Sequence, residues 1–315
     1  MSINKPFVLF FLKLLVIGMI IYTLGINLDF HLVKKNLFKV TPKTLILCIG
    51  WIEVNYFIHA LRWQEIIGCN FRKLPLSELW RHIFAANFLN QCLPSSVGGD
   101  VYRGLVMRYQ YKASNRWAVS STFMDRLYGF IGFIFLGVVA FPFQMKILFS
   151  SVLGKVVTVT LLGGMMGFVI LLMMSRLPMT KFQRKKAFKP FFKLSEDLSL
   201  TINNGKKAFR VMLFTFLTTI TVILPFYHLA QNLNIDLSLS QALITLPFAF
   251  VVSAVPLSLA GWGLREGAII SILHLFRVPY EEAFSLSLLL GFILLLSSLP
   301  GLGFWLTQNY QKNKR

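Results

Sequence analysis

The chain has 315 residues, of which 56% are hydrophobic and only 14% are charged. Soluble domains carry about 25% charged residues, so this composition excludes an ordinary soluble protein. The 31 Phe and 6 Trp residues also exclude a disordered or fibrous chain. We therefore expect an all-α polytopic membrane protein that forms a single integral membrane domain over residues 1–315.

Basic residues outnumber acidic residues by 32 to 12, which gives a formal net charge of +20. Most of them lie between apolar runs, where they set membrane topology and meet anionic lipid head groups. We therefore expect membrane lipids as partners and no nucleic acid. Because Cys48, Cys69 and Cys92 lack paired spacing, they are interpreted as small apolar fillers. The sequence indicates no metal, no cofactor and no catalytic motif, so we do not expect an enzyme.

Six apolar runs are long enough to cross a bilayer, which needs roughly 20 residues per helix. They are 7–27, 44–61, 118–141, 152–174, 209–231 and 282–307. The first run is longer than the apolar core of a signal peptide and lacks a cleavage site, so we expect an extra N-terminal helix. Its one charged residue, Lys13, is expected to reach toward the membrane surface or to pair locally.

Two further apolar stretches, 76–111 and 240–276, are interrupted by Pro and Gly clusters. The interruptions begin at Pro94 and Pro256, and such residues break helices. Irregular backbone is tolerated inside a membrane only where it faces protein or a water-filled cavity. These stretches are therefore predicted to be broken, re-entrant helical hairpins.

The two interruptions resemble each other at an offset of 162 residues. Pro94 is followed nine residues later by Arg103, and Pro256 is followed nine residues later by Arg265. The neighbouring spans follow nearly the same offset, which predicts repeat one over 44–141 and repeat two over 209–307, joined by helix 152–174 and the basic loop 176–208. The alternative is a chance likeness between two loops of common composition.

If each hairpin adds no net crossing, the two repeats run in opposite directions, as in many transporters. The loop 176–210 holds ten basic residues and 232–240 holds none, so we expect the first to be cytoplasmic and the second external. Both chain termini then lie in the cytoplasm, as do 62–75 and 103–116. One segment disagrees: 28–43 contains four lysines, yet the count of crossings places it outside.

Charged residues within the apolar regions are the candidates for function, because an unpaired one costs about 2.5–3.5 kcal/mol at a helix centre. These are Asp100, Arg103, Asp125, Arg126, Arg265 and Glu266. Three carboxylates and three guanidinium groups are able to pair completely, which is the structural interpretation. The functional interpretation is a polar cavity in which the arginines bind a lipid phosphate.

Backbone groups at the two breaks would complete this head-group site, because helix N-termini suit phosphate. The expected contacts are Ser95, Ser96, Gly98, Gly99, Ser258, Gly261 and Gly263. In the span 44–61, Glu53, Asn55 and His59 either line the cavity or form hydrogen bonds between helices.

Three segments carry a resemblance to a known family. The stretch 90–103 is similar to the first signature of the lysylphosphatidylglycerol synthase transmembrane-region family, also called the flippase-like domain family. The stretches 124–127 and 255–267 resemble its following charged motif and its second signature. Asp100 stands where many members have Glu. The resemblance implies a protein of the inner membrane that handles or translocates lipid, and because about eight residues follow the last span, the synthase domain is not expected.

Three functions remain open from the sequence. The first is a flippase that moves an anionic or prenyl-linked phospholipid or glycolipid across the inner membrane. The second is a membrane accessory protein in lipid or envelope glycolipid biosynthesis that binds a lipid or a biosynthetic enzyme without moving anything. Whether the protein forms a homo-oligomer is left open for all of these functions. The third is a lipid-modifying transferase, for which we identify no base. A transporter needs polar access from both leaflets, and an accessory protein does not.

Overall fold

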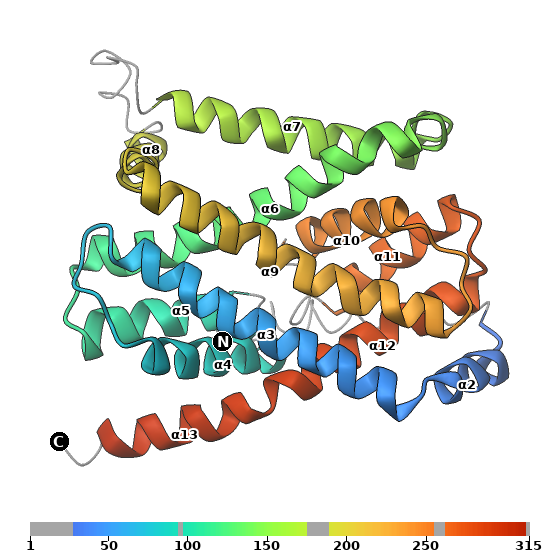
Figure 1. Cartoon of the computed structure of the whole chain (residues 1–315), viewed down its shortest axis with the longest axis horizontal. Coiled ribbons are helices and arrows are strands. Elements are labelled where there is room, and N and C mark those ends of the chain that lie inside the picture. Colours follow the sequence, from blue (N-terminus) through green and yellow to red (C-terminus); the bar gives the residue numbers. More distant parts are fainter. Residues whose placement is uncertain (1–27, 94–96, 175–188, 255–261, 313–315) are drawn as a thin grey trace, which may run out of the picture.

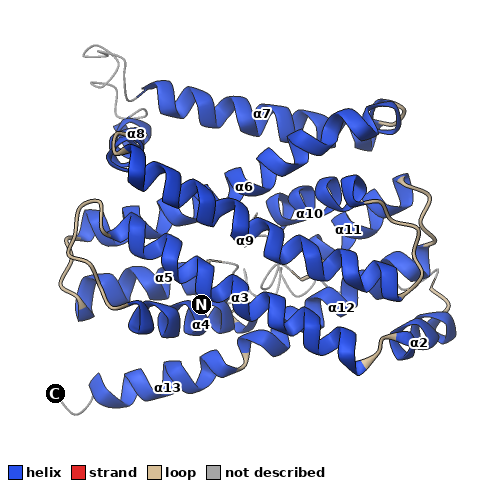
Figure 2. Cartoon of the chain, in the orientation of Figure 1, coloured by secondary structure: helices blue, strands red, loops and turns tan. Residues whose placement is uncertain are grey.

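The computed structural model describes residues 28–93, 97–174, 189–254 and 262–312. Within these ranges every regular element is a helix, as Figure 2 shows. The expected N-terminal helix 7–27 lies outside the described residues.

The described residues contain five helical stretches that are long and apolar enough to cross a membrane. They are α3 (Pro42–Ile67), α6 (Asn115–Phe149), α7 (Val152–Met174), α9 (Gly205–Asn232) and the stretch Tyr280–Thr307. The predicted runs 44–61, 118–141, 152–174 and 209–231 all lie inside these helices, so the prediction of a polytopic helical protein is confirmed.

The last predicted run, 282–307, is not one continuous helix. It covers most of α12 (Tyr280–Ser298) and part of α13 (Pro300–Lys312). Pro300 stands at the start of α13, where its missing N–H costs nothing and its fixed dihedral favours the first turn. In Figure 1, α13 continues in a different direction from α12.

Each interrupted stretch forms a pair of shorter helices. The first pair is α4 (Leu76–Cys92) and α5 (Gly98–Leu105), and the second is α10 (Leu239–Ser253) and α11 (Leu264–Leu275). The members of each pair pack against each other. In Figure 1, α4 and α5 occupy the left half of the molecule and α10 and α11 the right half. The order of one long, two short and one long helix thus occurs twice.

Two helical segments fall where the sequence indicated only connecting loops, and a third, short one lies at the end of the predicted hairpin 76–111. The segment 28–43 contains α2 (Phe30–Lys39), whose first turn is capped by the Asp29 carboxylate, 2.9 Å from the N–H of His31. The basic loop 176–208 contains α8 (Lys189–Ile202). A short π-helix, η1 (Val106–Gln110), follows α5. Such local capping and short amphipathic runs give no signal when only long apolar runs are counted.

The centre of the molecule lies between α3 and α9, which run side by side along its length (Figure 1). The buried face of α9 is unusually polar for an apolar helix and carries Thr215, Thr218, Thr219 and Thr221. Asn55 of α3 donates from Nδ2 to the Thr218 carbonyl oxygen at 2.6 Å and to Thr221 Oγ1 at 2.9 Å. These hydrogen bonds fix α3 against α9. The two helices together form one side of the charged site described below.

Candidate functional site

A cavity of about 280 Å³ lies between the two helix pairs. Both halves of the chain contribute to its walls, which come from α3, α4, α5, α6, α9, α10, α11 and α12. The charged residues that line it are Arg62, Asp100, Arg103, Asp125, Arg126 and Arg265. Five of these six were predicted from the sequence, and the structure brings all five to one cavity.

Asp125 of α6 is fully buried at the centre of the charged cluster. Its Oδ1 accepts a hydrogen bond from Arg62 Nε at 2.8 Å, and its Oδ2 accepts one from Arg103 Nη1 at 2.6 Å. His59 Nε2 lies 2.6 Å from the same Oδ2. A buried carboxylate needs such partners, because its charge is otherwise very costly to remove from water.

Asp100 extends the cluster toward α5. Its Oδ1 accepts from Arg103 Nη2 at 2.6 Å, and its Oδ2 accepts from Arg126 Nη1. Asp100 and Arg103 are three residues apart and share one face of α5, so this ion pair lies within a single helix. The neighbouring residues Asp125 and Arg126 reach different partners: Asp125 pairs with Arg62 and Arg103, and Arg126 pairs with Asp100.

Among the described residues, Arg62 is the one charged residue lining the cavity that was not predicted from the sequence. It was assigned to a cytoplasmic segment 62–75, but α3 continues to Ile67 and buries Arg62 to 4% exposure. Its spacing of three residues from His59 places both on one helix face, which is the signal that was available. With Arg62 included, there are four arginines and three carboxylates, where the sequence had predicted three of each.

The second half of the chain contributes Arg265 and Glu266 at the start of α11. Arg265 donates from Nε and Nη2 to Glu266 Oε1 at 3.0 Å and 2.5 Å. Glu266 Oε2 accepts the N–H of Gly263 at 2.6 Å, which caps the helix. Gly263 has a φ of 84°, a conformation in which a side chain is strained. The glycine thus allows the turn that brings Arg265 to the cavity.

Each of the two repeat-related arginines also lies over a tryptophan ring. The Arg103 guanidinium is 5.0 Å from the ring centre of Trp63, and that of Arg265 is 5.0 Å from the ring centre of Trp262. Aromatic faces attract cations, most strongly where water is excluded. The rings therefore help to hold both guanidinium groups in a largely apolar interior.

The backbones of α5 and α4 pack closely against each other, and this contact fixes the place of α5. A Cβ atom at Gly99 would collide with the carbonyl group of Ala86, and the Gly99 N–H donates to Asn90 Oδ1 at 2.7 Å. A Cβ at Gly98 would similarly meet the side chain of Leu93. Glycine at these positions permits the approach that aims Asp100 and Arg103 at α6.

A network of polar side chains holds α5 and η1 against α4. Tyr111 donates to Glu78 Oε2 at 2.7 Å, and its hydroxyl lies 3.1 Å from His82 Nε2. His82 Nδ1 lies 3.0 Å from the hydroxyl of Tyr102. Burial and the neighbouring Glu78 carboxylate raise the pKa of Tyr111, so its hydroxyl remains a neutral donor. Both ends of α5 and η1 are therefore fixed to α4.

The remaining predicted residues divide into three groups. Asn55 and His59 line the cavity, whereas Glu53 is not among the described residues that do. Gly98, Gly99 and Gly263 shape the helix starts as described above. The others lie outside the described residues: Pro94, Ser95, Ser96, Pro256, Ser258 and Gly261. Within the described ranges, no group of three or more His, Cys, Asp or Glu side chains is arranged to hold a metal ion.

Apolar helices of membrane-spanning length around a buried charged cavity define a polytopic helical membrane protein. Its sequence matches the family described as the lysylphosphatidylglycerol synthase TM region over residues 10–301, and the chain belongs to this family. It is also 25% identical over 214 residues to the UPF0104 membrane protein MJ1078 of Methanocaldococcus jannaschii. That match covers 64% of this chain and 86% of the relative.

Proposed function

We propose that this protein is a flippase that moves an anionic or prenyl-linked phospholipid or glycolipid across the inner membrane, with the head group passing through the central cavity. The observation that carries the proposal is the buried charge balance of the site. Four arginines, Arg62, Arg103, Arg126 and Arg265, face three carboxylates. A single phosphodiester would neutralise the remaining positive charge.

The chemistry of the excess cation favours phosphate as the ligand. Guanidinium groups present two parallel donors, which match the oxygen atoms of a phosphate better than a single ammonium does. Burial also makes an uncompensated charge costly, so a site with one extra cation gains free energy when an anion enters. A lipid supplies this anion while its hydrocarbon chains remain in the bilayer.

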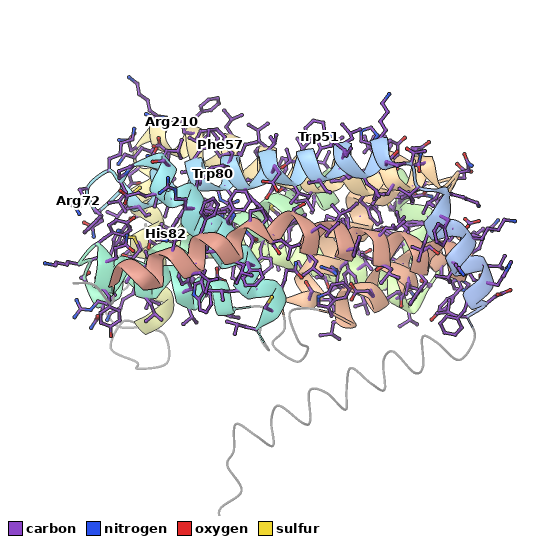
Figure 3. All side chains as sticks on the ribbon, turned by 90° about the horizontal axis from the view of Figure 1, so that it is seen from below. Trp51, Phe57, Arg72, Trp80, His82 and Arg210 are labelled. Atoms are coloured by element: carbon purple, nitrogen blue, oxygen red, sulfur yellow. The ribbon has the colours of Figure 1, made fainter. Side chains whose placement is uncertain are left out.

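The placement of the helix pairs supports passage rather than simple binding. The two helix pairs lie in opposite halves of the molecule (Figure 1) and both contribute residues to the cavity, which is the arrangement expected for inverted repeats. Arg72 and Arg210 both lie at the end from which α4 and α5 enter (Figure 3). By the positive-inside rule we assign this end to the cytoplasm, together with the C-terminus and the basic segment 176–208. The lysines of α2 then lie at the external end, as the count of crossings requires.

Reconstituted protein tests this function directly. Liposomes that contain the full chain should move labelled phosphatidylglycerol or a labelled prenyl phosphate between leaflets faster than labelled phosphatidylcholine. Protein-free liposomes provide the background rate. Tight binding of an anionic lipid without movement would instead favour the accessory protein, and neither binding nor movement would reject the head-group site.

A further inference from the structure

A second and more apolar cavity, of about 590 Å³, adjoins the charged one. It is a groove between α5 with η1 on one side and α6 on the other. Exposed apolar side chains form its walls: Val101 and Leu105 of α5, and Val119 and Phe123 of α6. We refer to it as the α5–α6 groove.

The α5–α6 groove and the charged cavity meet at a shared boundary. Asp100, Arg126 and Phe130 line both of them. The Arg126 side chain is 22% exposed, its guanidinium lies 5.6 Å from the ring centre of Phe130, and Nη1 donates to Asp100. Arg126 is therefore the cationic residue at the junction between an apolar surface and a polar interior.

We propose that the α5–α6 groove holds the hydrocarbon chain of the transported lipid and that Arg126 selects an anionic head group at its inner end. This rests on the proposed function and adds the chain-binding surface and the selecting residue. The ligand that fits both spaces is amphipathic, with a negative head beside Arg126 and an apolar chain along the groove. To enter the cavity, the phosphate takes the place of Asp100 on the Arg126 guanidinium.

The continuity of the two spaces argues for a lipid as the occupant. An apolar helix from this chain or from another protein would fill the groove but would leave the positive charge of the neighbouring cavity unbalanced. A soluble anion would balance the charge but would make no contact with the apolar walls of the adjoining groove, where Val119 and Phe123 are 67% and 51% exposed. One amphipathic molecule satisfies both requirements.

Photo-crosslinking tests the occupant without requiring transport. The photoreactive residue p-benzoylphenylalanine replaces Phe123 in the groove or, as a control, Phe143, which is 75% exposed on the same helix and lies outside the groove. The full chain is placed in phosphatidylcholine vesicles that contain a minor fraction of phosphatidylglycerol. Mass spectrometry then gives the ratio of the two lipid adducts at each position.

We expect phosphatidylglycerol to be enriched several-fold over the bulk ratio at position 123 and not at position 143. Arg126→Gln should return the ratio at position 123 to that of the bulk. A bulk ratio at position 123 in the otherwise wild-type chain would overturn the proposal. A crosslink from position 123 to residues 7–27 or to a second copy of the chain would also overturn it, because the groove would then hold protein.

A transport measurement separates this proposal from the proposed function. An added Cβ at Gly104 would lie 3.6 Å from the Ala118 carbonyl oxygen, so Gly104→Leu projects into the groove. Gly163→Leu on α7 is the control, because no atom of the described residues would lie within 4 Å of an added Cβ there. We expect severalfold slower lipid movement for Gly104→Leu alone. If Gly104→Leu transports like wild type while Arg265→Gln does not, the proposal that the α5–α6 groove holds the lipid chain is rejected. The proposed head-group site would then remain supported.

Discussion

Individual residues of the charged cluster act through shared partners rather than isolated pairs. Arg103 joins Asp125 and Asp100 through its two terminal nitrogens, and each carboxylate also binds a second arginine. Loss of one member therefore changes several interactions at once. The cost is expected to be largest at the residue with the most buried partners.

Asp125 is that residue, and its neutralisation is our first prediction. Asp125→Asn leaves Arg62 and Arg103 buried with one carboxylate fewer, which should destabilise the protein by roughly 3–5 kcal/mol. Thermal unfolding in detergent measures the change. Glu196→Gln is the control, since its pair with Arg116 is exposed and 3.4 Å long, and it should leave the unfolding temperature nearly unchanged. An Asp125→Asn protein as stable as wild type would show that this carboxylate does not hold the cluster together.

The second prediction concerns the geometry of Arg103. A lysine has one compact ammonium group and is unable to reach both carboxylates in the plane that the guanidinium uses. Arg103→Lys should therefore unfold at a temperature between those of the wild type and Arg103→Gln. Equal stability of Arg103→Lys and the wild type would mean that charge alone, without the two-sided contact, is sufficient.

At the scale of helices, the position of α5 depends on its close approach to α4. The third prediction follows from Gly99, where any Cβ would meet the Ala86 carbonyl group. Gly99→Ala should move α5 outward, lower the unfolding temperature and reduce lipid movement, because Asp100 and Arg103 follow it directly. Gly163→Ala on α7 has open space and should behave like wild type in both measurements. Similar results for the two variants would contradict the packing argument.

The sequence predicted the long helices and both interruptions because apolar length and Pro/Gly clusters are local signals. It also located most of the charged cavity, since charges in apolar stretches are rare. Arg62 was not predicted because the predicted span 44–61 ended just before this first basic residue. In the structure α3 continues past it, and the Asp125 carboxylate of α6 pairs with the buried Arg62 guanidinium. The α5–α6 groove was not predictable either, because its walls come from helices whose mutual placement depends on Gly99 and the His82 contacts.

At the scale of the whole molecule, the helix pairs α4–α5 and α10–α11 lie in opposite halves (Figure 1). The fourth prediction assigns the two ends of the molecule to opposite sides of the membrane. Single cysteines at Asn203 and Asp236, both exposed, are introduced after Cys48, Cys69 and Cys92 are replaced by serine. An impermeant thiol reagent should label position 236 from outside and position 203 only after the membrane is opened. Labelling of both from one side would exclude the inverted arrangement.

The most direct test of the head-group site compares two arginine variants by lipid selectivity. Arg265→Gln removes a buried cavity cation, whereas Arg210→Gln removes a half-exposed one that pairs with Glu65 outside the cavity. The quantity measured is the ratio of phosphatidylglycerol to phosphatidylcholine movement in liposomes, which does not depend on how much protein has folded. We expect a wild-type ratio well above one that is retained by Arg210→Gln and falls toward one in Arg265→Gln. An unchanged ratio in Arg265→Gln would contradict an anionic head-group site in this cavity.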